Sequence, residues 1–266
     1  MPITQGHRNG EAAEFTACIE AFVRGFAFTR SFTHPYLPER VGDVWVVRDA
    51  PRKQAADYRR EEWIAWGVDP AEVDRLARQN ARGHYCVCAF RATDEEDATL
   101  RAAYKALGYR LGGTEPFMAH RLRRVRKVPG PCPIVRVTSA DVADRLAKAA
   151  RTRQVLPEHL SGNSALWQYV ALEGGRPIGW VRSIVVPTAR GPAAWVSNMF
   201  VVPTRRRRGI GQAMLARMLR DDRRRGATRS VLLASHAGAM LYPRVGYESL
   251  GEILIYTPVR ARPLPD

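Results

Sequence analysis

A short segment between Met199 and Gly211 constrains the fold of this chain more than any other. Its sequence, MFVVPTRRRRGIG, joins a β-branched run, a proline, four arginines and two glycines. The β-branched residues favour a strand, and the proline ends it because it cannot donate to a sheet ladder. Apolar residues then recur at helical spacing from Ile210 to Leu219. The segment therefore predicts a strand, a basic turn and an amphipathic helix.

The turn in this segment has the chemistry of an anion site. A helix N-terminus presents unpaired backbone N–H groups and a partial positive charge. Glycines let a phosphate approach that backbone, and arginines add charge-assisted hydrogen bonds. A run of four arginines on its own is more often a solvated surface, but its place directly before Gly209 and Gly211 favours a polyphosphate ligand.

The same segment resembles the acyl-CoA site of the GNAT acetyltransferase superfamily, where an Arg/Gln-x-x-Gly-x-Gly/Ala turn grips the coenzyme A pyrophosphate. In this chain the motif begins at Arg206. A strand expected over 230–235 follows in the family's order. Next comes Gly238–Tyr247, similar to the family's Ala-x-x-Leu-Tyr-x-x-x-Gly-Phe/Tyr segment with glycine in the alanine's place. The resemblance covers roughly residues 133–258.

The resemblance implies a set of coenzyme-binding residues in the strand and the turn. Backbone groups of the strand would bond the pantetheine arm, and backbone N–H groups of the turn would cradle the pyrophosphate. Arg206 and Arg208 would add charge. The residues implied are Phe200, Val201, Arg206, Arg207, Arg208, Gly209, Ile210, Gly211 and Gln212.

The resemblance also implies a general acid. Tyr242 stands where the family has the tyrosine that protonates the leaving thiolate, and a phenol with a pKa near ~10 keeps its proton at neutral pH. The general base is harder to place, because 195–200 reads WVSNMF and has no carboxylate. Glu158 and His159, in the loop after the first helix of this half, are candidate bases, and His236 is another. A water chain or an unprotonated amine are alternatives.

Composition bounds the class of protein. With 266 residues and 45% hydrophobic content, the chain can form one large or two ordinary domains. Its net charge of +16 is uneven: residues 1–132 carry 21 basic and 17 acidic side chains, and residues 133–266 carry 21 and 9. The second half therefore favours an anionic partner such as coenzyme A. The arginine bias is also what a GC-rich genome would produce, since only four of the basic residues are lysine.

The four cysteines show no metal-ligand spacing. Cys86 and Cys88 would share one face of a strand, and Cys18 and Cys132 stand alone. Ordinary reduced thiols and no metal site are expected.

A short internal sequence repeat, called the internal echo below, occurs once in each half of the chain. Tyr104–Tyr109 matches Tyr242–Tyr247 at an offset of 138 residues, and each copy precedes an extended segment. We interpret it as two GNAT-like domains in tandem. The expected domains are a degenerate GNAT-like domain over 1–122, a linker over 123–133, a catalytic domain over 134–258 and a tail over 259–266.

The first copy lacks the coenzyme turn. At its place the sequence predicts a helix start with Asp69 as N-cap, Pro70 at the first position and Glu72 at the third. Its carboxylates would repel phosphate. Trp63 and Trp66, three residues apart, are expected on a helix as core or domain contacts.

In the second half the patterns predict a mixed, mostly antiparallel α/β fold with a sheet flanked by helices. Gly174 and Gly175 are expected to close a hairpin. Gly226 is a plausible stop for the coenzyme helix. Expected strands lie near 134–137, 168–172, 178–186, 194–202, 230–235 and 249–257, and expected helices near 140–150, 209–225 and 237–245.

The sequence therefore predicts an N-acetyltransferase that moves an acetyl group from acetyl-CoA to a primary amine by direct attack. A nucleic-acid-binding protein that uses the basic half and a non-catalytic CoA-binding regulator are the alternatives. The N-terminus lacks a signal-peptide core and no apolar run reaches the ~20 residues of a membrane helix. A cytoplasmic monomer or homodimer is expected, with no membrane and no specific nucleic-acid partner.

Overall fold

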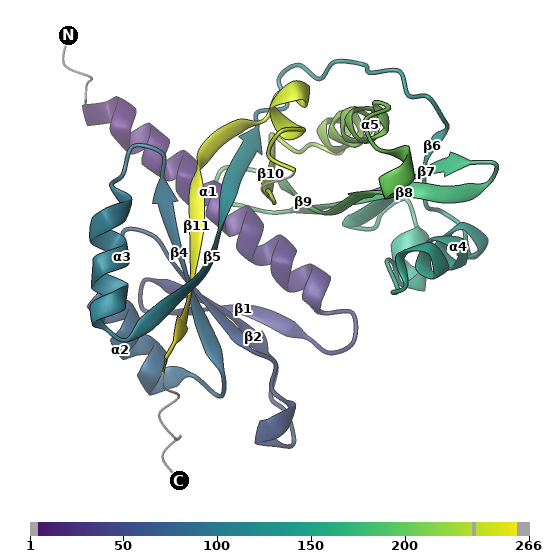
Figure 1. Ribbon diagram of the computed structural model, residues 1–266. Helices are drawn as coiled ribbons and strands as arrows, with labels where there is room; N and C mark the ends of the chain where they lie inside the picture. The colour runs from purple at the N-terminus through teal and green to yellow at the C-terminus, as the bar shows by residue number, and fades with distance from the viewer. Residues whose placement is uncertain (1–4, 236–237, 260–266) are drawn as a thin grey trace. The chain divides into compact units, whose positions relative to one another are not determined.

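The chain consists of two compact units, seen in a computed structural model that describes residues 5–235 and 238–259 (Figure 1). Unit 1 contains the residues up to Gly25 together with Met118–Glu248. Unit 2 contains Phe26–Phe117 together with the chain from Ser249 onward. Each unit therefore takes residues from both halves of the sequence.

Helices are interspersed among the strands along the chain. The helices are α1 Gln5–Arg30, α2 Pro70–Asn80, α3 Asp97–Ala106, α4 Ala140–Ala150 and α5 Ile210–Arg224, with short 3-10 helices η1 Ala55–Asp57, η2 Pro157–Leu160, η3 Pro203–Arg205 and η4 Tyr242–Val245. The strands are β1 Tyr36–Val41, β2 Val44–Asp49, β3 Glu61–Ala65, β4 Tyr85–Ala92, β5 Tyr109–His120, β6 Ile134–Arg136, β7 Leu166–Glu173, β8 Arg176–Val186, β9 Ala193–Val201, β10 Arg229–Leu233 and β11 Glu248–Pro258.

Unit 1 is built on strands in the order β10-β9-β8-β7-β6. Strands β6 to β9 are antiparallel neighbours, and β10 runs parallel to β9. Gly174 and Gly175 close the β7–β8 hairpin with φ of 54° and 76°, as predicted, because a tight hairpin turn needs the left-handed backbone region. The strand–turn–helix predicted around Met199–Gly211 is present as β9, η3 and α5.

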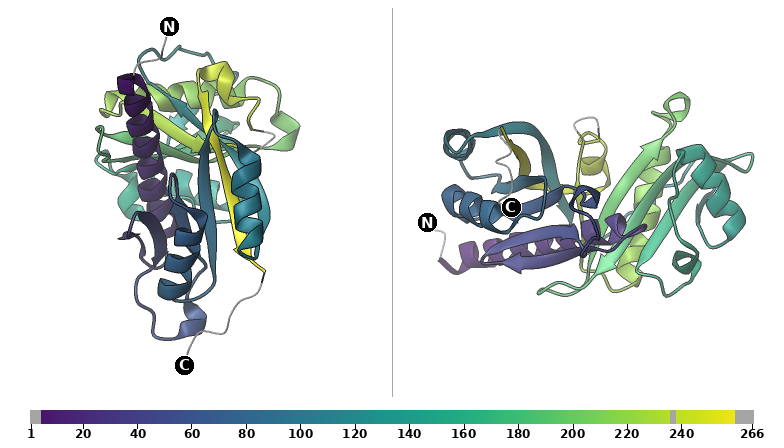
Figure 2. Two further views of the ribbon diagram at one scale, coloured as in Figure 1. Left: turned by 90° about the vertical axis from the view of Figure 1, so that its left-hand side faces the viewer. Right: turned by 90° about the horizontal axis from the view of Figure 1, so that it is seen from below.

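Helix α5 lies along one face of this sheet (Figures 1 and 2). Its apolar side chains form the core of unit 1 with side chains from β7 to β10. Gly179 of β8 permits the close approach, because a Cβ there would lie 3.0 Å from Met214 Cε and 3.0 Å from the Phe200 carbonyl oxygen. The helix side of the core consists of Ile210, Met214, Leu215, Met218 and Leu219.

Unit 2 has strands in the order β1-β2-β3-β4-β11-β5. Strands β3 and β4 are parallel, and the other described registers in this unit are antiparallel. Its core gathers buried residues of the sheet with α2 and α3. The helix start predicted in this half is correct: Asp69 caps α2 by accepting a 2.8 Å hydrogen bond from the Ala71 backbone N–H, and Pro70 follows.

The two units do not divide at the predicted linker. Segment 123–133 lacks regular structure, as expected, but lies inside unit 1. The difference arises because β11 pairs antiparallel with β4, joining Gly251–Tyr256 to 87–92 in unit 2. Strand pairing over such a separation leaves no local signal in the sequence.

The two copies of the internal echo also share a local structure. Tyr104 and Tyr109 pack edge-to-face with ring centroids 5.6 Å apart, and Tyr242 and Tyr247 do the same at 5.6 Å. The glycine before each second tyrosine, Gly108 or Gly246, has a positive φ and donates its N–H over 3.1 Å to the carbonyl three residues earlier. The two copies therefore share this local geometry, and the duplication itself stays a prediction.

Two predictions of secondary structure were wrong. Trp63 lies on strand β3 and is fully buried, and Trp66 follows that strand, so neither is helical. The helix expected over 237–245 is reduced to η4 at Tyr242–Val245 behind a turn, because Pro243 lacks the N–H that a longer helix would need. Helix α4, by contrast, has the predicted bounds.

The four cysteines are free thiols, as expected. Cys86 and Cys88 face the same side of β4 with their sulfur atoms 4.0 Å apart.

Within unit 1, helix α1 packs in close contact with strand β9. A Cβ added at Gly25 would lie 2.2 Å from Trp195 Cβ and 2.4 Å from its Cγ. Trp195 is also packed edge-to-face against Phe22, with ring centroids 5.1 Å apart. Gly25 is therefore required by packing rather than by backbone conformation.

We expect Gly25→Ala to destabilise the protein by about 1–3 kcal/mol, the usual range for overpacking a filled core. Gly10→Ala, in the same helix but with nothing within 4 Å of the added Cβ, is the matched control. It should stabilise the helix by up to about 1 kcal/mol, since alanine has the higher helix propensity. Urea unfolding of both variants measures this, and equal effects would contradict the packing argument.

Candidate active site

The turn before α5 holds its backbone in an unusual conformation. After η3, Arg206 is extended, Arg207 has φ of 64°, and Gly209 has φ of 80° as the N-cap of the helix. A positive φ is costly for an arginine, so the surrounding structure must impose it. Alternating hands of backbone turn successive N–H groups toward one side and form an anion-binding concavity.

Six consecutive N–H groups, those of residues 207–212, have no partner among the residues that the structure describes. The first helical bond of α5 runs from the Ala213 N–H to the Gly209 carbonyl, at 3.0 Å. Within the described part of the chain, the backbone N–H groups of residues 207–212 donate to no backbone or side-chain acceptor. These are the groups predicted to cradle the pyrophosphate.

The four arginines of the turn have different surroundings. Arg205 forms an ion pair with Glu173, with Nη2 2.6 Å from Oε2. Arg206 folds back on β9, where its Nε donates to the Val201 carbonyl oxygen at 2.9 Å. Arg207 and Arg208 are exposed and form no ion pair with any described residue, so they can meet an incoming anion.

Strands β9 and β10 part beside this turn. Their parallel register ends at the pair Trp195–Val231, although β9 continues to Val201 and β10 to Leu233. Beyond Trp195, β9 keeps β8 on one side and has lost its partner strand on the other. Phe200 and Val201, predicted to bond the pantetheine arm, lie on this parted segment. Phe200 also stacks on Trp180 of β8, with ring centroids 4.6 Å apart.

A β-bulge interrupts β9 at the same place. The β8–β9 register shifts between Trp180 and Arg182, and Asn198 has φ of 55°. The Asn198 amide donates to the Gln154 side chain, which belongs to the loop after α4. On the neighbouring strand, Arg182 Nε donates to Ser197 Oγ at 3.1 Å. The bulge therefore ties the loop predicted to border the acceptor to the strand predicted to hold the donor.

The two glycines of the motif serve different purposes. A Cβ on Gly209 would meet nothing within 4 Å, so its side of the turn is open. A Cβ on Gly211 would lie 3.1 Å from Leu241 Cδ2 and 3.1 Å from Met199 Cε. Gly211 therefore permits packing inside the protein, and Gly209 permits the backbone conformation at the open side. The predicted role of Gly211 in phosphate approach does not follow from this geometry.

Tyr242 lies at the start of η4 and is buried, with 7% of its surface exposed. Its ring touches the backbone turn before it, since a Cβ on Gly238 would lie 3.1 Å from Tyr242 Cε2. Burial raises the pKa of the phenol to about 12. Among the described residues, its hydroxyl has no hydrogen-bond partner. It is a protonated donor held in place by its ring and free at its oxygen.

His120, which sequence reasoning missed, supports the Tyr242 segment. It is buried at the end of β5, and its Nδ1 accepts a 2.9 Å hydrogen bond from the Leu122 backbone N–H. Its ring also bonds the backbone of Val245 and packs edge-to-face on Tyr247, with centroids 5.6 Å apart. In the sequence, His120 is distinguished only by its position at the end of an extended segment. That signal is too weak to predict a supporting role.

The candidate bases differ in whether they can accept a proton. His159 is buried in η2, and its Nδ1 accepts a 3.1 Å hydrogen bond from the Leu156 N–H. Burial lowers its pKa, so the ring is neutral with its proton on Nε2 and its lone pair engaged. In this conformation His159 offers a donor and not a base. Glu158 is an exposed carboxylate beside it. His236 lies outside the described residues.

Two further predicted residues, Ile210 and Gln212, were expected to contribute through their backbone N–H groups. Ile210 is buried in the core of unit 1, so only its N–H faces the turn. Gln212 is half-buried at the start of α5. Groups of three or more His, Cys, Asp or Glu side chains that could hold a metal ion do not occur in the described part of the chain.

Comparison with a protein family agrees with this geometry. Residues 164–249 match the acetyltransferase (GNAT) domain. The match spans β7 to the start of β11, and so includes the parted strands, the turn and Tyr242. The resemblance predicted from the sequence is confirmed for this region. The family match does not reach the first half of the chain, so the degenerate GNAT-like domain over 1–122 stays a prediction.

Solved structures share the fold over most of the chain. A GCN5-related N-acetyltransferase from Kribbella flavida is 16% identical, with a TM-score of 0.64, and the match covers 92% of this chain and 96% of that one. A GCN5-related N-acetyltransferase from Sphaerobacter thermophilus is 16% identical with a TM-score of 0.53, covering 80% and 76%. A putative GNAT-family acetyltransferase from Novosphingobium aromaticivorans is 14% identical with a TM-score of 0.51, covering 84% and 92%. The predicted fold class is confirmed.

No curated protein matches the chain by sequence. In the described residues, none of the helices has both the length and the apolar character required to span a bilayer.

We expect stability to fall as the pH drops below about 6.5, the pKa of an unperturbed histidine. Burial lowers the pKa of His120, against the opposing effect of the Glu248 carboxylate, so protonation favours the unfolded state. The stabilising contribution is complete above the unfolded-state pKa and is lost as the pH falls toward the folded-state pKa. His159 adds to the same trend.

Urea unfolding at pH 7.5 and 5.5 measures the effect. His120→Gln should show a smaller loss of unfolding free energy between the two pH values than the wild type. His84→Gln, a change at an exposed position, is the control and should keep the wild-type loss. An unchanged loss in His120→Gln would show that His120 does not titrate in this range.

Proposed function

We propose that this chain, which carries an acetyltransferase (GNAT) domain over residues 164–249, moves an acetyl group from acetyl-CoA to an amine. The single observation that carries the proposal is the run of six N–H groups at residues 207–212, which have no acceptor in the described part of the chain and lie beside the parted strands β9 and β10. Donors left unsatisfied in a row are suited to a pyrophosphate, which can accept all of them.

The donor is held from two sides in this proposal. The turn and the exposed guanidinium groups of Arg207 and Arg208 receive the pyrophosphate, and the free edge of β9 receives the pantetheine arm. Arg206 lies between them, with its Nε on the Val201 carbonyl oxygen. From that position it closes the strand end against the turn and leaves its outer N–H groups for phosphate.

Tyr242 supplies the proton for the leaving group. The amine nitrogen attacks the thioester carbon, and the carbon–sulfur bond then breaks as the sulfur takes the Tyr242 proton. A phenol whose pKa is raised to about 12 stays protonated at neutral pH and gives up its proton only to a developing thiolate. The proton released by the amine passes to water, and Glu158 is the carboxylate among the predicted candidate bases.

A non-catalytic CoA-binding regulator is the second candidate. One observation favours it: β9 has no carboxylate, and the lone pair of His159 Nδ1 is engaged by the Leu156 N–H. Turnover would distinguish the two, since a regulator binds acetyl-CoA and releases no thiol. An acceptor panel of amino acids, polyamines, aminoglycosides and peptide N-termini, assayed by free-thiol release, makes this test.

Acetyl-CoA binding should depend on the open side of the turn. Gly209→Asp places a carboxylate where the pyrophosphate would lie, and we expect the acetyl-CoA Kd to rise at least tenfold, about 1.4 kcal/mol. Gly226→Asp is matched, because Gly226 ends the same helix with φ of 88°, against 80° at Gly209, and both added side chains enter open space. It should bind as the wild type does. Calorimetry measures both, and equal affinities would remove the turn from the site.

Tyr242→Phe should lower kcat by about 10²–10⁴-fold, as removal of a general acid typically does. The acetyl-CoA Kd should stay within twofold, because the sulfur gains charge only in the transition state. Tyr104→Phe, in the equivalent place of the first copy, is the control and should leave kcat unchanged. Steady-state kinetics with an acceptor from the panel measures this. An unchanged kcat in Tyr242→Phe would assign the tyrosine to packing.

A further inference from the structure

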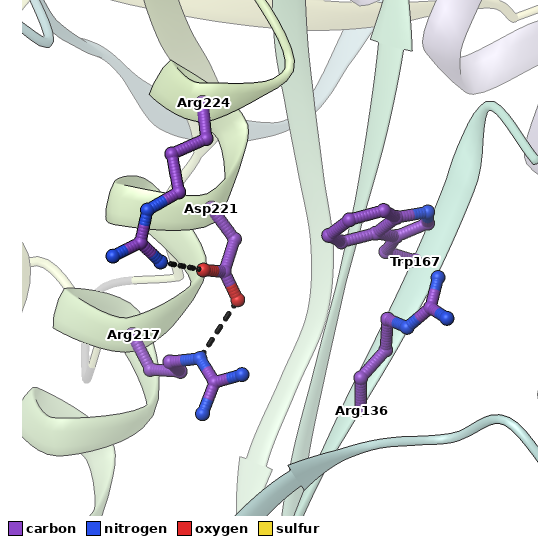
Figure 3. Close-up of a pocket in the computed structure, with 5 residues that line it drawn as sticks. All are labelled: Arg136, Trp167, Arg217, Asp221 and Arg224. Atoms are coloured by element: carbon purple, nitrogen blue, oxygen red, sulfur yellow. Dashed lines mark hydrogen bonds and ion pairs between the residues drawn. The ribbon is translucent and has the colours of Figure 1, made fainter. Parts of the chain in front are cut away.

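A pocket lies along the C-terminal half of α5, away from the turn that precedes the helix (Figure 3). Its volume is about 280 Å³, and its lining residues are Arg136, Trp167, Arg217, Asp221 and Arg224. One wall comes from the last two turns of α5 and the other from β6 and β7. Nothing in the proposed transfer reaction uses it.

The helix wall is organised around a buried carboxylate. Asp221 is 5% exposed and accepts hydrogen bonds from Arg217 Nε at 2.7 Å, Arg224 Nη1 at 2.8 Å and the Tyr169 hydroxyl at 3.2 Å. A guanidinium has five N–H donors, and Arg217 and Arg224 each donate one of them to Asp221. Within the described residues, their other donors have no protein acceptor. Asp221 thus fixes two guanidinium groups and leaves most of their donors available.

Two further cations contact Trp167 of the facing wall: Arg136 of β6, and Arg225, which directly follows α5 and is not itself a lining residue. The guanidinium groups of Arg136 and Arg225 each lie 4.3 Å from the centroid of the Trp167 ring. Arg136 donates only to the Ser161 carbonyl, at 3.3 Å, and has no carboxylate partner among the described residues. Arg225 donates to the carbonyls of Ser164 and Ala165. The stacked indole orients both guanidinium groups while neutralising neither.

The charges around the pocket do not balance. Among the described residues, Arg217 and Arg224 form ion pairs with Asp221, Arg225 forms one with the neighbouring Asp222, and Arg136 forms none. Asp222 is fully buried beneath the pocket, where it accepts a 2.8 Å hydrogen bond from Ser183 Oγ. Burial raises its pKa to about 7, so it carries less than a full negative charge at neutral pH. A net charge of at least two positive units remains.

We infer that this pocket binds a small molecule that carries at least two negative charges on phosphate or carboxylate groups. Fixed guanidinium forks on two walls match such oxyanions, which accept paired N–H donors. The volume lies just under the about 300–1,000 Å³ of pockets for drug-sized ligands, so it suits a compact metabolite.

The inferred site is separate from the coenzyme turn. The lining residues of α5 begin at Arg217, seven positions after Ile210, and end at Arg224, fourteen positions after it, which at 1.5 Å per residue is about 10–21 Å along the helix. The inference therefore does not rest on the proposed function, and a ligand here would not compete with acetyl-CoA. A chain without acetyltransferase activity could still have this site.

Calorimetric titration of the full chain tests the inference. The protein is first saturated with coenzyme A so that the turn is occupied, and ionic strength is held constant with sodium chloride. Glycerol 3-phosphate and citrate are the two probes, one a phosphate ester and one a polycarboxylate. We expect one of them to bind at a single site, and the tighter one identifies the ligand class.

Arg136→Gln should weaken binding of that probe at least fivefold, and so should Arg217→Gln. Arg136→Gln is the cleaner variant, because Arg136 holds no buried charge and its loss should leave folding intact. Arg223→Gln, on the exposed neighbour of Arg224 outside the pocket, is the matched control and should bind as the wild type does. No saturable binding of either probe, or equal loss in Arg136→Gln and Arg223→Gln, would overturn the inference.

Discussion

The candidate active site depends on how closely the first turn of α5 approaches its neighbours. Met199 of β9 and Leu241 before η4 both come within 3.1 Å of the space that a Cβ on Gly211 would occupy. Because Gly211 has no side chain, the turn before α5, the parted end of β9 and the Tyr242 segment can pack against one another. Gly179 does the same beneath the helix, where Met214 passes over β8. Because these contacts are between backbones and core side chains, the site is built on rigid elements, and the free N–H groups are held ready for a ligand.

The polar groups of the candidate site are positioned mainly by the backbone conformation. The predicted arginines contribute less than the sequence suggested, since Arg205 and Arg206 are engaged within the protein. The donors of the turn are free because Gly209 and Arg207 hold positive φ. His120 acts similarly at a distance, fixing the carbonyl of Val245 next to the turn that carries Tyr242. Catalytic geometry of this kind is specified by positions where the backbone bends, and side-chain identity alone does not reveal it.

Much of unit 1 could be predicted, because its signals are local. The proline and glycines around α5 and the Gly174–Gly175 hairpin each lie within a few residues of the structure they determine, and so does the cap of α2 in unit 2. Features that depend on distant partners could not. The bulge at Asn198 and the unfilled edge of β9 arise from pairing with two other strands. Trp63 was misplaced because three-residue spacing cannot separate a helix from a buried strand of unit 2, where even Glu61 and Glu62 are buried.

The pairing of β11 with β4 has a consequence for how the chain is made. Phe90 of β4 is aligned with Ile253, so some 160 residues must leave the ribosome before this edge of unit 2 can close. Until then, β4 presents unpaired N–H and carbonyl groups beside apolar side chains, the kind of edge that recruits the wrong partner. Contacts of such separation are slow to form, because the loop-closure entropy is lost before the pairing is gained. Unit 2 therefore completes only after most of unit 1 has been synthesised.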